Sequence, residues 1–197
     1  MGVSRRLTRA SAGLVVALSL AFAQHAQAQV NSTLSNIRID NFGQIDAHYY
    51  RGAQPDPSDF KDLATLGVRM VIDLTKDGRA DEQQLVERAG MKFHRIPMTT
   101  TDRPSDTAVQ EFLALVNNPA NQPVYVHCQG GRHRTGVMTA AYRMTQAGWN
   151  ADQAYGEMKK YGFETLLGHP ELKKFVYDFY AQMGQAHRVA VVPATIK

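Results

Sequence analysis

The stretch that decides the fold of this chain reads His127-Cys128-Gln129-Gly130-Gly131-Arg132-His133-Arg134-Thr135-Gly136. The apolar residues 124–126 before it indicate a short buried strand, and residues 137–146 after it have the pattern of a helix that ends before Gly148. The stretch is therefore predicted to join the carboxyl end of a strand to the amino end of a helix. Backbone N–H groups in such a loop, together with the positive end of the helix dipole, favour binding of a phosphate-like anion.

The residue types in this loop predict a reactive thiol. A free cysteine has a pKa of ~8.5, but backbone amides, a helix N-terminus and a nearby arginine can lower the pKa of Cys128. Five residues separate Cys128 from Arg134, so the loop can wrap around a tetrahedral group and return the guanidinium to two of its oxygens. Gly130 and Gly131 allow the backbone to aim successive amides at one point. Thr135 is placed where its hydroxyl can donate to the sulfur.

The other residues of the loop are expected to surround the anion. The residues predicted to bind substrate are Gln129, Gly130, Gly131, Arg132, His133 and Gly136. The side chains of Arg132 and His133 are expected to point outward, either to meet a polyanionic substrate or simply as solvated loop charges. His127 is predicted to orient the loop by bonding to backbone. A buried, inert Cys128 with solvated basic neighbours is the alternative interpretation of the stretch, and no second cysteine is present to form an internal disulfide.

The rest of the chain alternates between strand and helix patterns, which predicts an α/β fold: a single domain with a central, mostly parallel sheet flanked by helices. Strands are predicted at residues 37–39, 48–51, 68–74, 92–96 and 124–126, and helices at 57–66, 81–89, 105–117, 137–146, from 150, and at 171–182. Ligands of such sheets bind beyond the carboxyl ends of the strands, where the loop is placed. The domain is predicted to cover residues 29–183, and residues 184–197 are expected to be a flexible tail.

The loop resembles the signature of the cysteine-dependent protein tyrosine phosphatase superfamily, in particular its dual-specificity branch: His-Cys, five residues, Arg, then Ser or Thr and Gly. Residues 50–55, which read Tyr-Arg-Gly-Ala-Gln-Pro, and residues 118–123 resemble the plant and fungal atypical dual-specificity phosphatases. The resemblance covers residues 49–179. It implies a protein-tyrosine-phosphatase-like fold in which Cys128 attacks phosphorus and Arg134 binds the phosphoryl oxygens, with no metal and no other cofactor.

The family also uses an aspartate upstream of the cysteine as general acid, and residues 99–106 occupy its place. Asp102 is preferred because it lies in the loop before Pro104. Asp106, the alternative, is expected in the first turn of the next helix, where a carboxylate favours the dipole. Within this family, the predicted substrates are phosphotyrosine proteins or inositol phosphates. Phosphoserine and phosphothreonine proteins are a further option. The other functions considered are a rhodanese-type sulfurtransferase and a phosphate-binding module without catalysis.

Charged residues that follow the predicted strand 68–74 lie at the same edge of the sheet as Cys128. Lys76, Asp77 and Arg79 are expected either to contact a second phosphate or to form an ordinary solvated turn around Asp77-Gly78. The histidines outside the loop do not show the spacing of metal ligands. No metal site is therefore predicted.

Residues 1–28 have the pattern of a signal peptide, with Arg5, Arg6 and Arg9 before an apolar stretch and Ala26-Gln27-Ala28 as cleavage site. Export to the periplasm or outside a bacterial cell is predicted, by general secretion or by the twin-arginine route, without stable membrane insertion after cleavage. Without these residues the chain holds 19 Lys and Arg against 18 Asp and Glu. This balance argues against nucleic-acid binding. The mature protein is expected to be a monomer.

Overall fold

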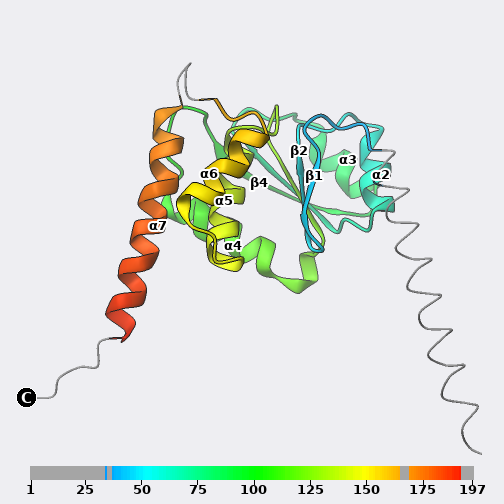
Figure 1. Cartoon of the computed structure of the whole chain (residues 1–197). Helices are drawn as coiled ribbons and strands as arrows, with labels where there is room; N and C mark the ends of the chain where they lie inside the picture. The colour runs from blue at the N-terminus through cyan, green and yellow to red at the C-terminus, as the bar shows by residue number, and fades with distance from the viewer. Residues whose placement is uncertain (1–33, 35–36, 165–168, 192–197) are drawn as a thin grey trace, which may run out of the picture. The chain divides into compact units, whose positions relative to one another are not determined.

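The computed structural model describes residue 34, residues 37–164 and residues 169–191, with no side-chain detail beyond residue 185 (Figure 1). The elements are β1 (Gly43–Asp46), β2 (Tyr49–Gly52), α2 (Asp59–Thr65), β3 (Met70–Thr75), α3 (Glu82–Arg88), β4 (Lys92–Met98), α4 (Asp106–Asn117), the 3-10 helix η1 (Pro119–Asn121), β5 (Val124–His127), α5 (Arg134–Gln146), α6 (Ala151–Lys160) and α7 (Pro170–Val191). The signal peptide predicted at residues 1–28 lies outside the described residues. Among those described, no helix is both long and apolar enough to cross a membrane.

Five strands form one sheet in the order β1-β2-β5-β3-β4. β1 pairs with β2 in antiparallel fashion, and every other neighbouring pair is parallel. β5 occupies the middle of the sheet, where Val71 of β3 lies opposite Tyr125 and Asp73 lies opposite His127. All residues of β3 and β5 are buried, as expected for parallel strands that are covered on both faces.

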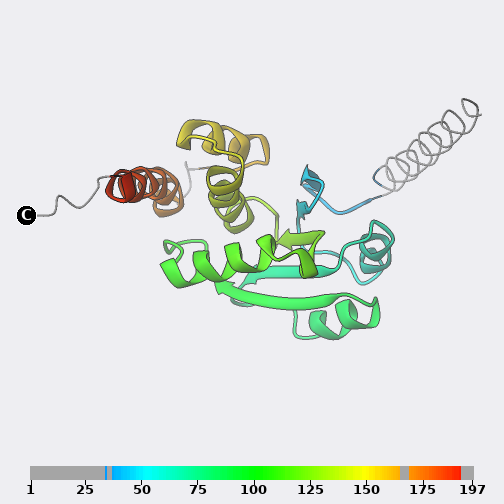
Figure 2. The same ribbon diagram turned by 90° about the horizontal axis from the view of Figure 1, so that it is seen from below.

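Helices cover both faces of the sheet. The main core packs alternate strand residues such as Ile72 and Val126 against Phe112 of α4 and Met138 of α5. Figure 2 shows α4 and α5 on one side of the sheet and α3 on the other. The predicted α/β class, with a mostly parallel sheet between helices, is thereby confirmed.

The main differences from the predicted elements concern the first strand, the start of α5 and the end of α7. Residues 37–39 do not form a strand. The first strand is β1, whose sequence lacks apolar alternation and whose pairing with β2 is a tertiary effect. α5 begins at Arg134, three residues earlier than predicted. α7 continues to Val191, so residues 184–191 are helical rather than tail. Gly184 suggested an end, but one glycine inside a helix costs only about 1 kcal/mol.

Candidate active site

The predicted anion-binding loop, residues 128–133, lies at the carboxyl end of β5 and leads into α5. Its backbone turns at Gly131, where φ is 63°. A β-carbon at Gly131 would lie 2.4 Å from the carbonyl carbon of Gly52 in β2, so both the turn and the close approach require glycine. At Gly130 a β-carbon would meet no atom closer than 3.8 Å. Of the two glycines that the sequence offers, the packing requires only Gly131.

Gly136 does not have the role predicted from the sequence. Its N–H group donates to the carbonyl of Arg132 at 3.2 Å, as part of the first turn of α5. A β-carbon there would lie 3.4 Å from Met158 of α6. The β-carbon would therefore make only an ordinary van der Waals contact, and because the amide is used within the first turn of α5 it is not a free donor for an anion.

Cys128 is buried, with 3% of its surface exposed. Burial alone raises the pKa of its thiol, but hydrogen bonds from the Thr135 hydroxyl and from the N–H groups of Thr135 and Gly131, with the charge of Arg134, bring the pKa below its ordinary value. The Thr135 hydroxyl is itself buried and has no hydrogen-bond partner that meets ordinary geometry among the described residues, so no other acceptor competes with the sulfur for its proton. The loop therefore favours the thiolate.

Replacing Thr135 with valine, which keeps the shape and removes the hydroxyl, is expected to raise the pKa of the Cys128 thiol. Alkylation by iodoacetamide, followed against pH, should show its midpoint moved upward. Any step in which sulfur leaves as thiolate should slow by about 10-fold, the smaller effect of losing a hydrogen bond to a charged atom. Thr145→Val is the control, because that hydroxyl bonds within α5 to the carbonyl of Ala141. An unchanged midpoint in Thr135→Val would contradict the assignment.

Arg134 is held in place by one of its nitrogens and keeps others available. Nη1 donates to the carbonyl of Met98 at 3.2 Å and lies 3.8 Å from Oδ1 of Asp77. Nε is buried and has no partner among the described residues. A cavity of about 470 Å³ opens beside this side chain, lined by Lys76, Asp77, Met98, Thr99, Thr100, Gln129 and Arg134. An anion in this cavity would supply the missing acceptor.

The charged turn after β3 contributes unequally to this cavity. Lys76 and Asp77 line it, whereas Arg79 makes two hydrogen bonds to Asp81, of 3.1 and 2.9 Å. Of the two cations considered for a second phosphate, only Lys76 therefore faces the cavity, and Asp77 offsets its charge.

The two carboxylates proposed for acid catalysis lie in different settings. Asp102 is exposed, accepts a hydrogen bond from the Thr99 hydroxyl at 2.7 Å, and lines a cavity of about 320 Å³ that shares Lys76, Met98 and Thr99 with the cavity at Arg134. Asp106 lines neither cavity and is the first residue of α4, as expected from the sequence. The geometry favours Asp102 over Asp106.

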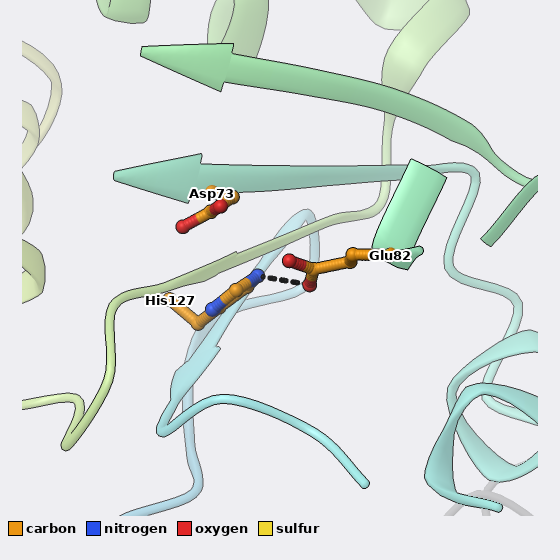
Figure 3. A group of neighbouring side chains, drawn as sticks. All are labelled: Asp73, Glu82 and His127. Carbon is orange, nitrogen blue, oxygen red and sulfur yellow. Dashed lines mark ion pairs between the residues drawn. The ribbon is translucent and has the colours of Figure 1, made fainter. Parts of the chain in front are cut away.

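His127 lies beneath the loop in a buried polar cluster drawn in Figure 3. Its Nε2 is 2.9 Å from Oε1 of Glu82 in α3, and both side chains are fully buried. Nδ1 has no hydrogen-bond partner among the described residues. Nε2 likewise meets hydrogen-bond geometry with no described residue, so the predicted bond from His127 to backbone is wrong for this part of the chain. The polar group nearest to the ring is the carboxylate of Glu82, which accepts a hydrogen bond from Gln54 at 2.8 Å.

The same cluster has the composition of a metal site, because Asp73, Glu82 and His127 each offer a ligand atom within 4.8 Å of the others. However, the Arg95 guanidinium lies 2.7 Å from Asp73 and 3.6 Å from Glu82. This cation is a partner for both buried carboxylates and offsets part of their negative charge. The cluster is better described as an ion-pair network that supports β3, α3 and β5.

Two residues outside the loop, Arg51 and Asn41, donate hydrogen bonds to the carbonyl of Gly131. Neither was predicted from the sequence to be a site residue. Arg51 of β2 is fully buried, donates from Nη2 to the carbonyl of Gly131 at 2.5 Å, and lies 3.9 Å from the ring centre of Tyr161. Asn41 donates to the carbonyls of Gly131 and Tyr161 at 3.1 and 2.9 Å. With the carbonyl of Gly131 bound on this side, the peptide is held in the orientation that the anion site needs. The motif at residues 50–55 was a signal for Arg51.

The basic residues of the loop differ in direction. Arg132 is exposed, as predicted. His133 instead packs its ring at 3.9 Å from that of His169 and at 5.4 Å from that of Phe163. Burial, His169 and the neighbouring arginines lower the pKa of His133 to about 4. His133 is therefore neutral at neutral pH, and the prediction of an outward, basic side chain was wrong.

Comparison with known proteins places the chain among phosphatases. A family model described as a DSP-PTPase phosphatase fused to NAD+ kinase matches residues 22–171. The probable tyrosine-protein phosphatase DG1060 of Dictyostelium discoideum is 30% identical over 126 residues, which are 61% of this chain and 75% of that protein. The dual specificity protein phosphatase TpbA of Pseudomonas aeruginosa is 31% identical over 124 residues, which are 62% of this chain and 55% of TpbA.

The inositol diphosphatase SIW14 of Saccharomyces cerevisiae is 26% identical over 130 residues, 63% of this chain and 46% of SIW14. A crystal structure of its core catalytic domain with citrate has the same fold, with a TM-score of 0.63 at 22% identity over 79% of this chain and 96% of that one. The chain thus spans about half the length of SIW14 and of TpbA. Because the family model matches well over half of the chain, the protein belongs to the DSP-PTPase phosphatase family, and its resemblance to the atypical dual-specificity phosphatases is confirmed.

Proposed function

We propose that the protein hydrolyses phosphate monoesters through a cysteinyl-phosphate intermediate. The observation that carries this proposal is the buried Cys128 thiol, whose pKa is lowered by its loop and by Arg134, the residue that begins α5. The Nε of Arg134 has no partner within the described part of the chain. Nucleophile and anion clamp therefore belong to one rigid segment. Neither sulfur transfer nor phosphate binding without turnover is favoured by a specific observation.

The reaction proceeds in two displacements. In the first, Sγ of Cys128 attacks phosphorus, the P–O bond to the leaving group breaks, and Asp102 gives its proton to the leaving oxygen. In the second, water attacks phosphorus, Asp102 takes a proton from that water, and the S–P bond breaks. The Thr135 hydroxyl stabilises the departing thiolate. Arg134 and the loop amides hold the equatorial oxygens throughout, where charge accumulates in both transition states.

The charges around the cavity favour a substrate with one phosphomonoester in the site. Lys76 and Arg134 are opposed there by Asp77, which leaves little excess positive charge for a densely phosphorylated inositol. We therefore place phosphotyrosine proteins first and inositol phosphates second. Among relatives, TpbA is named a dual specificity protein phosphatase and has been solved with phosphotyrosine, whereas SIW14 is named an inositol diphosphatase.

Two measurements test the proposed function. Acid quench during turnover of a ³²P-labelled aryl phosphate should trap phosphate on Cys128, and a thiol that carries no label would contradict the mechanism. Rates on a phosphotyrosine peptide, a phosphoserine peptide and inositol hexakisphosphate at equal concentration should rank the first substrate highest. Faster release from inositol hexakisphosphate would reverse the substrate order while leaving the mechanism intact.

Replacing Asp102 with asparagine is expected to slow turnover by about 10²- to 10⁴-fold for substrates with poor leaving groups, because the general acid is lost. Aryl phosphates whose leaving oxygen needs no proton should be affected much less in their first step. Initial rates on phenyl phosphate and p-nitrophenyl phosphate provide the comparison. Asp106→Asn is the matched control, and a larger effect of this variant would transfer the acid role to Asp106.

We also propose that residues 1–28 direct export, on the basis of the arginines, the apolar stretch and the small residues at the cleavage site. Expression of the full chain in a bacterium should yield a mature protein in the periplasmic fraction that begins near Gln29. N-terminal sequencing decides this, and an intact Met1 in the cytosolic fraction would contradict it.

A further inference from the structure

His169 lies immediately before α7 and contacts two loops that belong to the proposed active site. Its Nδ1 is 2.7 Å from the carbonyl oxygen of Thr100, in the loop that carries Asp102. Its ring centre is 3.9 Å from that of His133, in the catalytic loop. One side chain thus joins the segment with the proposed acid to the segment with the nucleophile.

The hydrogen bond to Thr100 defines which ring nitrogen carries a proton. A carbonyl oxygen only accepts hydrogen bonds, so Nδ1 of His169 must be the donor. This donor is present in the Nδ1-protonated neutral ring and equally in the imidazolium. The contact therefore holds the loop in either charge state of His169. Because His133 is neutral at neutral pH, with a pKa of about 4, the two rings can lie together without repulsion between two cations.

A second contact ties the same loop to α7. Arg103 donates to Asp178 at 2.6 Å, and its guanidinium lies 5.1 Å from the ring centre of Phe175. The exposed Asp102 lies between these two anchor points, at Thr100 and Arg103, and its carboxylate is bound within the loop by Thr99. A salt bridge that is partly exposed, such as that of Arg103, contributes little. The contact of His169 is made directly to a backbone carbonyl, that of Thr100, so it is the one that can define the backbone position of the loop.

We propose that His169 is a positioning residue that sets the distance between Asp102 and the phosphate site by holding the carbonyl of Thr100 against the catalytic loop. The inference rests on the proposed function, because it gives His169 a role only where Asp102 transfers a proton. A displacement of about 1 Å at a reacting group can cost on the order of 10²-fold, so loss of this contact should affect the proton-transfer step selectively.

The test compares two variants of the full chain. His169→Leu removes the donor and keeps the bulk, whereas His169→Asn keeps an N–H donor close to the position of Nδ1. In His169→Leu, kcat/KM on phenyl phosphate should fall by about 10-fold or more, with kcat/KM on p-nitrophenyl phosphate changed by less than about 3-fold, because kcat/KM reports only the steps up to cleavage of the P–O bond. His169→Asn should restore most of the rate on phenyl phosphate. Equal losses on both substrates, or no loss on either, would overturn the proposal.

Two further measurements separate positioning from a general structural defect. In an Asp102→Asn background, His169→Leu should cause no additional loss on phenyl phosphate, since both changes act on one step. Amide hydrogen exchange at residues 99–103 should accelerate in His169→Leu while that of β5 stays the same. If Cys128→Ser retained turnover, the proposed function would fail. Unchanged exchange at residues 99–103 would instead overturn the role of His169 alone.

Discussion

Replacement of Cys128 by serine should abolish turnover, with a loss on the order of 10⁴-fold or more, as found when an enzyme loses its nucleophile. The site stabilises a thiolate: amides, the Thr135 hydroxyl and Arg134 together overcome the effect of burial on the pKa of Cys128. A serine hydroxyl has a far higher pKa, so the same surroundings do not ionise it. Release of phosphate from an aryl phosphate, measured at pH 7 with high enzyme concentration, gives the residual rate.

The serine variant should keep its fold and its anion site, because oxygen replaces sulfur in a buried position with little change in shape. Calorimetry should show an unlabelled phosphotyrosine peptide bound with an affinity similar to the KM of the unmodified protein, and the melting temperature should be unchanged. A variant that still turns over substrate would remove Cys128 from the reaction. A variant that binds nothing would indicate that the thiolate is part of the binding site.

The catalytic loop could be predicted from sequence because its function depends on neighbours in the chain. Cys128, Gly131, Arg134 and Thr135 are close in sequence, and the strand before and the helix after them carry clear patterns. The parallel sheet followed from the same alternation of strands and helices. These are local properties, and the structure places the four residues in the loop after β5 and in the first turn of α5.

The supporting residues could not be found in this way, because their partners are distant in the chain. Arg51 reaches the carbonyl of Gly131 across 80 positions, and Asn41 reaches the same carbonyl across 90. Glu82 lies in the first turn of α3, yet it is fully buried against His127. Burial of a carboxylate depends on the packing of α3 against the sheet, which no local pattern reveals.

The direction of the His133 side chain shows the same limit. The sequence predicted an outward side chain, but the ring contacts His169 and Phe163, which belong to segments that follow α5 in the chain. The positions of these two rings depend on how α6 and α7 pack. Because of this packing, His133 is a neutral, partly buried side chain and not the surface cation that was predicted. Fewer cationic side chains therefore surround the site than the sequence predicted. Arg132 is exposed, and Lys76 lines the cavity beside Arg134.

Replacement of Arg134 by lysine should reduce kcat/KM by about 10²- to 10³-fold, although the charge is kept. Arg134 uses Nη1 for the carbonyl of Met98 and retains a buried Nε that bonds to none of the residues described by the structure. A guanidinium can hold this anchor and grip two phosphoryl oxygens at once, whereas an ammonium has neither the planar fork nor the reach. Steady-state rates on p-nitrophenyl phosphate should fall, and the inhibition constant of vanadate should rise.

Charge and geometry can be separated by following the thiol in the same variants. Because lysine retains the positive charge that helps to lower the pKa of Cys128, the pH midpoint of alkylation should move little in Arg134→Lys and clearly upward in Arg134→Met. Arg132→Lys, an exposed change in the same loop, should alter kcat/KM by less than about 3-fold. Full activity in Arg134→Lys would mean that charge alone suffices. An equal loss in Arg132→Lys would mean that both arginines bind the transferred phosphoryl group.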